Sequence, residues 1–188
     1  MSKVNNVRLA IGATVFGAFL ATAPSVFAEE TQCRGTIGAR TLDNIFVPDG
    51  ERCVLNGTRA KGSVVVGRGA TLTANRVRIN GNLQAEGAQS VWLRDFSAVG
   101  GSVQIVQGRA AIIETASIEG GLLFDENAGS VRATRNSIGD NLQAFQNTGG
   151  VAISNNVIDG NLQCKANVPA PTGGGNQASS KEDQCANL

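Results

Sequence analysis

The 188-residue sequence predicts an all-β protein, a single-stranded parallel β-helix (β-solenoid) of about six to seven turns, each of about 19–20 residues. Three observations support this prediction. A phrase of the form Ile-x-Gly-Asn-Leu-Gln returns at a fixed period, apolar and polar residues alternate after each return, and 24 glycines supply tight corners. Self-similarity at a short fixed period is typical of stacked units that bury a continuous core between them.

The repeat phrase sets the frame of the stack. The complete phrase occurs at residues 79–84 and 158–163, and partial matches to it lie between them. An earlier turn begins near Thr41. The later turns open at anchor residues that lie 19 or 20 positions apart: Ala60, Ile79, Val99, Ile118, Ile138 and Ile158. A left-handed hexapeptide helix requires a multiple of six residues per turn, so this alternation favours right-handed winding.

Each turn is predicted to contain three short strands. In the turn opened by Val99, Val103 and Ile105 form one alternating pair, and Ala111 and Ile113 form a second. A two-residue apolar period is that of a strand with one buried face. The anchor adds a third apolar position before the next corner, whereas a helical period of 3.6 residues is nowhere sustained.

One strand allows two registers, because the extra residue of its turn can fall on either side of it. Within residues 91–94, placing Val91 and Leu93 inward is the more apolar choice. Since successive side chains of a strand point to opposite faces, this choice predicts that Trp92 lies on the surface.

The N-terminal residues have the pattern of a cleavable secretory signal peptide. Lys3 and Arg8 precede an apolar run at residues 9–21, and small residues at 26–28 offer a cleavage site. The run is short for a bilayer-spanning helix, so the mature chain is expected to be exported without membrane insertion, to the periplasm or the medium. The predicted segments are a signal peptide (1–28), an N-terminal cap and first turn (29–59), the solenoid repeats (60–167) and a C-terminal capping segment (168–188).

Composition argues against several classes of function. Removing residues 1–28 leaves 14 basic and 15 acidic residues, which gives no electrostatic basis for binding nucleic acid. Histidine is absent, so no imidazole can activate a serine or bind a metal. No phosphate-binding or dinucleotide-binding motif is present. The sequence therefore favours a non-enzymatic protein with no cofactor and no metal site.

Four cysteines are predicted to form two disulfides at the ends of the stack. Cys33 lies one full turn of the repeat before Cys53, and Cys164 lies about one turn before Cys185. An even number of cysteines is typical of exported proteins with disulfides. Each bridge closes a loop of about 20 residues and is expected to stabilise the folded protein by roughly 3 kcal/mol, because it lowers the entropy of the unfolded chain. Residues 168–188 depart from the repeat and are expected to form a loop across the last turn.

Polar residues recur at fixed positions and form a candidate surface ladder. Its members are Asn82, Gln84, Gln104, Asn141, Gln143, Asn161 and Gln163. Stacked amides can stabilise the solenoid by hydrogen bonding along its axis. The functional alternative is a flat face that recognises a glycan, and an envelope protein is the other candidate partner.

Two carboxylates form a weaker candidate site. Asp95 and Glu114 occupy the same offset before successive anchors, so they are expected to be neighbours on adjacent turns. A pair of carboxylates suits Ca²⁺ binding or acid–base cleavage of a glycosidic bond. The alternative is that both are solvated residues of a corner.

The repeats, together with the closing segment at residues 160–185, resemble exported bacterial β-solenoid proteins, a largely uncharacterised group. Only the spacing of the repeats is similar to that of bactofilins, which are polymer-forming right-handed β-helices. The chain differs from them in its predicted signal peptide and its paired cysteines. Pectate-lyase-like solenoids share the winding with longer turns, so no catalytic residue is carried over from them. Short uniform turns with no pocket-forming insertion instead predict a cell-envelope or extracellular scaffold or adhesion module. The alternative is a small polysaccharide-binding or polysaccharide-degrading protein that uses Asp95 and Glu114.

Overall fold

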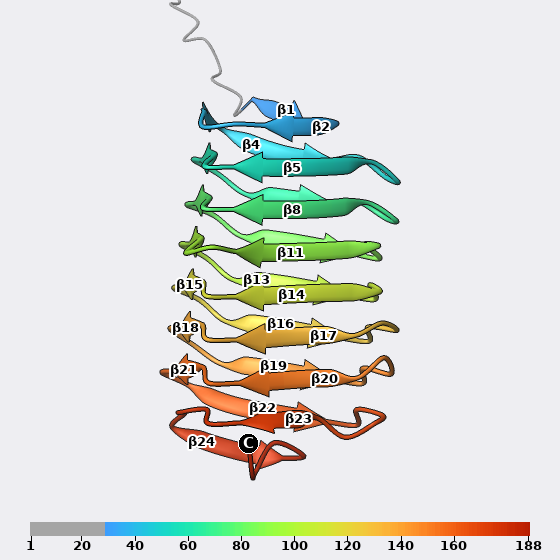
Figure 1. The fold of residues 1–188 in the computed structure, drawn as a ribbon, viewed down its shortest axis with the longest axis vertical. Coiled ribbons are helices and arrows are strands. Elements are labelled where there is room, and N and C mark those ends of the chain that lie inside the picture. Colours follow the sequence, from blue (N-terminus) through green and yellow to red (C-terminus); the bar gives the residue numbers. More distant parts are fainter. Residues whose placement is uncertain (1–28) are drawn as a thin grey trace, which may run out of the picture.

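The computed structural model of the protein describes residues 29–188, so the predicted signal peptide lies outside the described residues. Turns of the chain stack along one axis, from the first described strand at one end to the C-terminus at the other (Figure 1). Every pairing between strands is parallel, and the strands form three sheets that run the length of the stack. This arrangement confirms the predicted parallel β-solenoid.

The strands of each sheet follow one another once per turn. Sheet A contains β1 (Glu30–Gln32), β4 (Asn44–Val47), β7 (Val64–Val66), β10 (Leu83–Glu86), β13 (Val103–Val106), β16 (Leu122–Asp125), β19 (Leu142–Phe145), β22 (Asn161–Lys165) and β24 (Ser180–Asp183). Sheet B contains β2 (Gly35–Ile37), β5 (Arg52–Asn56), β8 (Thr71–Asn75), β11 (Ser90–Arg94), β14 (Ala110–Glu114), β17 (Val131–Thr134), β20 (Val151–Ser154) and β23 (Thr172–Gly174). Sheet C contains β3 (Thr41–Leu42), β6 (Arg59–Ala60), β9 (Arg78–Ile79), β12 (Ala98–Val99), β15 (Ser117–Ile118), β18 (Ser137–Ile138) and β21 (Val157–Ile158).

The stack is longer than the sequence predicted. Sheet B has eight strands, which corresponds to about eight turns in place of six to seven. The C-terminal segment accounts for much of the difference, because it continues the stack where a loop was expected. β23 pairs with β20 and β24 pairs with β22, both in parallel. Gly173 and Gly174 occupy β23, so the apolar alternation that predicts a strand is missing although the backbone pairing is present.

Inward side chains form one continuous core. Along sheet A, buried residues at equivalent positions stack on one another: Val64, Leu83, Val103, Leu122, Leu142 and Leu162. Burial of each such side chain contributes roughly 1.5–3 kcal/mol. The inward register of β11 is confirmed, because Val91 and Leu93 are buried while Trp92 is 36% exposed.

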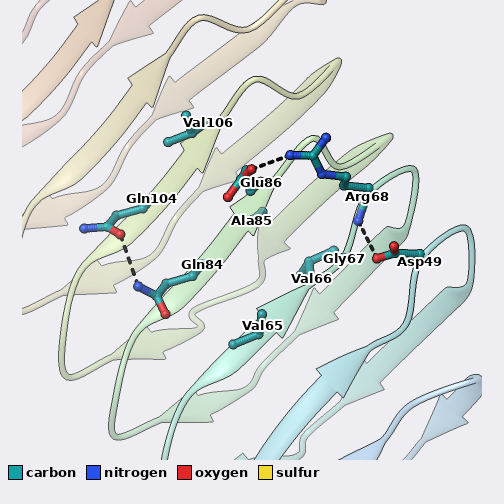
Figure 2. Close-up of a pocket in the computed structure, with 10 residues that line it drawn as sticks. All are labelled: Asp49, Val65, Val66, Gly67, Arg68, Gln84, Ala85, Glu86, Gln104 and Val106. Atoms are coloured by element: carbon teal, nitrogen blue, oxygen red, sulfur yellow. Dashed lines mark hydrogen bonds and ion pairs between the residues drawn. The ribbon is translucent and has the colours of Figure 1, made fainter.

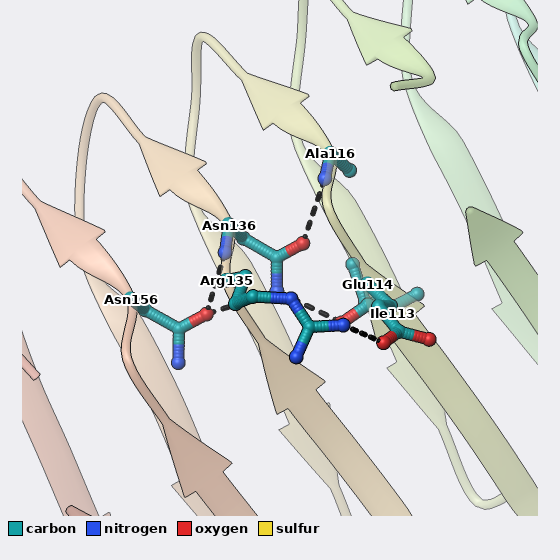
Figure 3. Close-up of polar contacts among 6 residues, drawn as sticks. All are labelled: Ile113, Glu114, Ala116, Arg135, Asn136 and Asn156. Carbon is teal, nitrogen blue, oxygen red and sulfur yellow. Dashed lines mark hydrogen bonds and ion pairs between the residues drawn. The ribbon is translucent and has the colours of Figure 1, made fainter. Parts of the chain in front are cut away.

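Buried asparagines line two corners in the C-terminal half of the stack, a feature that the sequence reasoning missed. Asn127, Asn147 and Asn167 lie between sheets A and B, with Asn136, Asn156 and Asn176 between sheets B and C. Each asparagine except the terminal ones hydrogen-bonds to its counterparts one turn before and after. Figure 3 shows Asn136 bonded to Asn156 and to the backbone N–H of Ala116. The spacing of one turn within each set is the signal from which these ladders are predictable.

Both predicted disulfides are present near the ends of the stack. Cys33 bonds to Cys53 with Cα atoms 5.5 Å apart, and Cys164 bonds to Cys185 with Cα atoms 5.2 Å apart. These separations are ordinary for a disulfide. No helix in residues 29–188 is long and apolar enough to cross a bilayer.

Candidate functional site

The outer face of sheet A carries the glutamines of the predicted ladder. Strand pairing places Gln84 beside Gln104 and Gln143 beside Gln163, with Leu123 between the two pairs. Glu182 continues the same column on the last strand. The column therefore runs along the solenoid axis on one flat face, and Leu123 divides it in two.

Hydrogen bonds connect the glutamines within each half. Gln84 Nε2 donates to Gln104 Oε1 at 3.3 Å, and Gln143 Nε2 donates to Gln163 Oε1 at 2.8 Å. Gln163 Nε2 in turn donates to Glu182 Oε2 at 2.8 Å. Hydrogen bonds from Ser180 and Gln163 lower the pKa of Glu182. Gln84 and Gln104 are exposed whereas Gln143 and Gln163 are half-buried, so the first pair is the more accessible to a ligand.

Two asparagines of the predicted ladder, Asn82 and Asn141, lie outside the strands of sheet A, whereas Asn161 is the first residue of β22. Asn82 and Asn141 are half-buried at the corner that leads from sheet C into sheet A, and Asn161, also half-buried, pairs with Ser180 at the start of β22. Asn82 Oδ1 accepts the backbone N–H of Ser102 at 2.9 Å, and Asn141 Oδ1 accepts that of Asn161 at 2.8 Å. The hydroxyl of Ser63 accepts the backbone N–H of Asn82 in the same way. The side chains of Asn82 and Asn141 join successive turns, whereas those of Gln84 and Gln104 face solvent.

A shallow groove opens on sheet A beside Gln84 and Gln104 (Figure 2). Its volume is about 470 Å³, and its lining residues are Asp49, Val65, Val66, Gly67, Arg68, Gln84, Ala85, Glu86, Gln104 and Val106. The size lies within the range of about 300–1,000 Å³ that is common for small-ligand sites. The groove thus adds a recess to the accessible half of the glutamine column.

Charged side chains form one side of this groove. Arg68 Nη2 lies 2.7 Å from Glu86 Oε1, and Asp49 Oδ1 accepts the backbone N–H of Arg68 at 2.9 Å. Val65 is 37% exposed and offers an apolar surface next to Gln84. The groove therefore combines a small apolar area, planar amides with donors and acceptors, and a charged rim.

A second hollow of about 360 Å³ lies at the far end of the same sheet and is lined by Asp125, Phe145, Gln146, Lys165 and Ala166. Asp125 Oδ1 is buried and has no hydrogen-bond partner among the described residues. Burial and the neighbouring charge of Glu126 raise the pKa of the Asp125 carboxyl. The Asp125 carboxyl therefore favours its protonated form more than an exposed aspartate does.

The two candidate carboxylates are not equivalent in the strand register. β11 and β14 pair up to Leu93 and Ile113, so the residue in register with Glu114 is Arg94. Asp95 follows in a corner where both Asp95 and Phe96 have positive φ, at 59° and 61°. The extra residue of this longer turn lies in that corner, which the alternating pattern of the strands could not locate.

Glu114 instead forms an ion pair with Arg135 one turn further on (Figure 3). Asp95 is exposed and has no side-chain hydrogen bond or ion pair within residues 29–188. In the same described part of the chain, no three His, Cys, Asp or Glu side chains gather into a group that could hold a metal ion. The register therefore gives no shared carboxylate site at this corner.

The fold and its faces define a class, a disulfide-linked parallel β-solenoid with a grooved polar sheet. Comparison of the chain with protein-family profiles, with curated proteins and with solved structures gives no match. Function is therefore inferred from the chemistry of the exposed faces.

Proposed function

We propose that the protein is an exported, non-enzymatic bacterial β-solenoid that serves as a cell-envelope or extracellular scaffold or adhesion module. In this proposal the flat outer face of sheet A recognises a glycan. The observation that carries the proposal is the constant register of the parallel strands, which places Gln84, Gln104 and the adjoining groove on one rigid face.

Export is supported by two features of the chain. The two disulfides indicate an oxidising compartment, since such bonds are rare where thiols are kept reduced. Residues 1–28 have the sequence pattern of a signal peptide, and the repeat phrase resembles that of exported bacterial solenoids.

The chemistry of the groove suits a sugar unit. A pyranose ring presents an apolar face and a rim of hydroxyls, and the groove offers Val65 and Val106 beside the amides of Gln84 and Gln104. Amides serve as both donors and acceptors, which matches the dual character of a hydroxyl. Because the strands are fixed in the stack, binding loses little conformational entropy, and this favours affinity on a shallow surface.

The test is binding of the purified, oxidised protein to an array of bacterial and plant glycans, with and without Ca²⁺. We expect saturable binding to one glycan class. The double variant Gln84→Leu/Gln104→Leu should weaken that binding about tenfold, because two hydrogen-bonding amides are lost. Gln89→Leu is the matched control, since Gln89 is exposed on a corner outside the groove. Equal affinity of the double variant and the control would exclude this face as the site.

The alternative function, a small polysaccharide-degrading enzyme that uses Asp95 and Glu114, has no specific observation in its favour. Acid–base cleavage requires two carboxylates that flank one glycosidic bond. Glu114 is engaged by Arg135, and Arg94 occupies the position in register with it. We therefore propose glycan recognition without cleavage.

A further inference from the structure

Arginines gather on sheet C in the N-terminal turns. Arg59 on β6 and Arg78 on β9 are in register on adjacent strands, and both point outward. Arg40 directly precedes β3, and Arg76 lies two residues before Arg78. All four side chains are exposed. We call these four residues the arginine ladder.

Among the residues that the structure describes, the arginine ladder has no counter-ion. No ion pair or side-chain hydrogen bond within residues 29–188 involves any of its four guanidinium groups. Residues 1–28 contain no aspartate or glutamate. The nearby Lys61 is already paired with Asp43 at 3.1 Å. The positive charge of the ladder is therefore free for a partner outside the chain.

This arrangement is unfavourable for folding by itself. Like charges at directly opposite positions of adjacent strands, about 4.8 Å apart, destabilise a sheet. The same column continues with small or neutral residues, which are Ala98, Ser117 and Ser137. In this column, like charges therefore face each other only in the N-terminal turns. Locally unfavourable arrangements of this kind are expected where a surface has a function.

Two hollows flank the ladder along the solenoid axis. One, of about 350 Å³, is lined by Glu29, Thr31, Arg40, Thr41, Leu42, Asp43 and Lys61. The other, of about 150 Å³, lies beside Arg78 and is lined by Ile79, Asn80, Ala98, Val99, Gly100, Ser117 and Glu119. Arg59 lies between the strands that border the two hollows. The first hollow, the positive charge of Arg59 and the second hollow therefore follow one another along the solenoid axis.

We propose that the arginine ladder binds a linear anionic polysaccharide laid along the solenoid axis. Guanidinium groups bind carboxylate and sulfate oxygens through paired, charge-assisted hydrogen bonds. Asn80 and Ser117 offer amide and hydroxyl groups to the sugar hydroxyls in the second hollow. This site is separate from the sheet A groove and does not depend on the glycan proposed to bind there.

The shape of the ladder favours a narrow polymer over a broad anionic surface. Strands of sheet C are two residues long, so the basic strip is narrow. Glu119 and Asp159 occupy the corner positions that directly follow β15 and β21, on later turns of the same edge. These carboxylates would repel a lipid membrane or a long duplex that covered the whole edge, whereas a narrow polymer over the arginine ladder avoids Asp159 and meets Glu119 only where it lines the second hollow.

The test is titration of the oxidised protein with polygalacturonate, with dextran sulfate and with phosphatidylglycerol vesicles, using neutral dextran as the uncharged probe. We expect binding to one or both polyanions, weakened by added salt, and no binding to neutral dextran. The variant Arg59→Gln/Arg78→Gln should bind about tenfold more weakly, because two charge-assisted contacts are removed. Its thermal midpoint should equal or exceed that of the parent, since a repulsive pair is relieved.

Arg109→Gln/Arg132→Gln is the matched control, because it removes the same charge from two exposed arginines away from sheet C. Unchanged binding in this control supports the ladder, whereas an equal loss in both double variants would mean non-specific attraction and overturn it. Absence of polyanion binding, or binding confined to phosphatidylglycerol vesicles, would also overturn the proposal. Gln84→Leu/Gln104→Leu should retain polyanion affinity, which separates this outcome from the fate of the sheet A groove.

Discussion

At the scale of single residues, the buried asparagines show how a polar side chain can hold together an otherwise apolar stack. Asn147 Nδ2 donates to the Phe124 carbonyl at 3.0 Å and to Asn167 Oδ1 at 2.8 Å. Its Oδ1 accepts the backbone N–H and the side-chain amide of Asn127, at 3.0 and 2.9 Å. Every polar atom of the side chain is satisfied, so burial carries no desolvation penalty from an orphaned group.

Replacement of Asn147 should therefore destabilise the protein strongly. Asn147→Ala leaves the backbone N–H and side-chain amide of Asn127 without their acceptor, and we expect a loss of about 2–4 kcal/mol of unfolding free energy. Asn147→Asp should also destabilise, because a carboxylate cannot donate to the Phe124 carbonyl. Urea unfolding measures the effect, with Asn80→Ala as the control on an exposed corner. Equal urea midpoints for Asn147→Ala and the control would contradict a stabilising role for the buried asparagines.

Replacement of Asp125, in contrast to that of Asn147, is expected to stabilise the protein, and to do so only at neutral pH. Its carboxyl pKa is raised in the folded protein by burial and by Glu126, so the charged form is less favourable there than in the unfolded chain. Stability from this group is complete below the unfolded pKa and is lost as pH rises through the folded pKa. Asp125→Asn should raise the thermal midpoint at about pH 7 and change it little at about pH 3. A midpoint that is lower at neutral pH would refute this reasoning.

At the scale of elements, strands were predictable and corners were not. A two-residue period follows from backbone geometry, so Val103, Ile105 and their equivalents identified the strands of sheets A and B. Corners have no such period, and the position of the extra residue at Asp95 could not be derived from the apolar pattern. The predicted carboxylate pair depended on that position. The polar ladder likewise mixed Gln84, which faces solvent, with Asn82, which joins turns.

The position of the extra residue predicts the effect of two deletions. Removal of Asp95 would shorten its turn to the length of the preceding turn and should leave the folded structure and its cooperative unfolding intact. Removal of Trp92 should abolish both, because loss of one residue within β11 turns inward side chains outward. Far-ultraviolet circular dichroism with thermal melting distinguishes the two. Similar damage from both deletions would mean that the corner at Asp95 has a strict length.

At the scale of the whole molecule, the C-terminal end is built to stop the stack. β24 places Lys181 in register with Leu162 and Asp183 in register with Cys164, so charges stand where earlier turns have apolar side chains. Gln184 ends one asparagine ladder, accepting from Asn167 Nδ2 at 3.1 Å and donating to its carbonyl at 3.0 Å. A further turn stacked on β24 would bury these charges without partners, which is strongly unfavourable.

Removing those charges should therefore open the end to association. We expect Lys181→Leu/Asp183→Val to form larger species as concentration rises, because its last strand then offers an apolar row and free backbone groups to another copy. Sedimentation velocity over a range of concentrations measures this, with the parent protein as reference. Lys165→Leu/Asp159→Val makes the same chemical change on lateral surfaces and should sediment like the parent. If both variants associate alike, added hydrophobicity alone is the cause, and the charges of β24 have no special role in ending the stack.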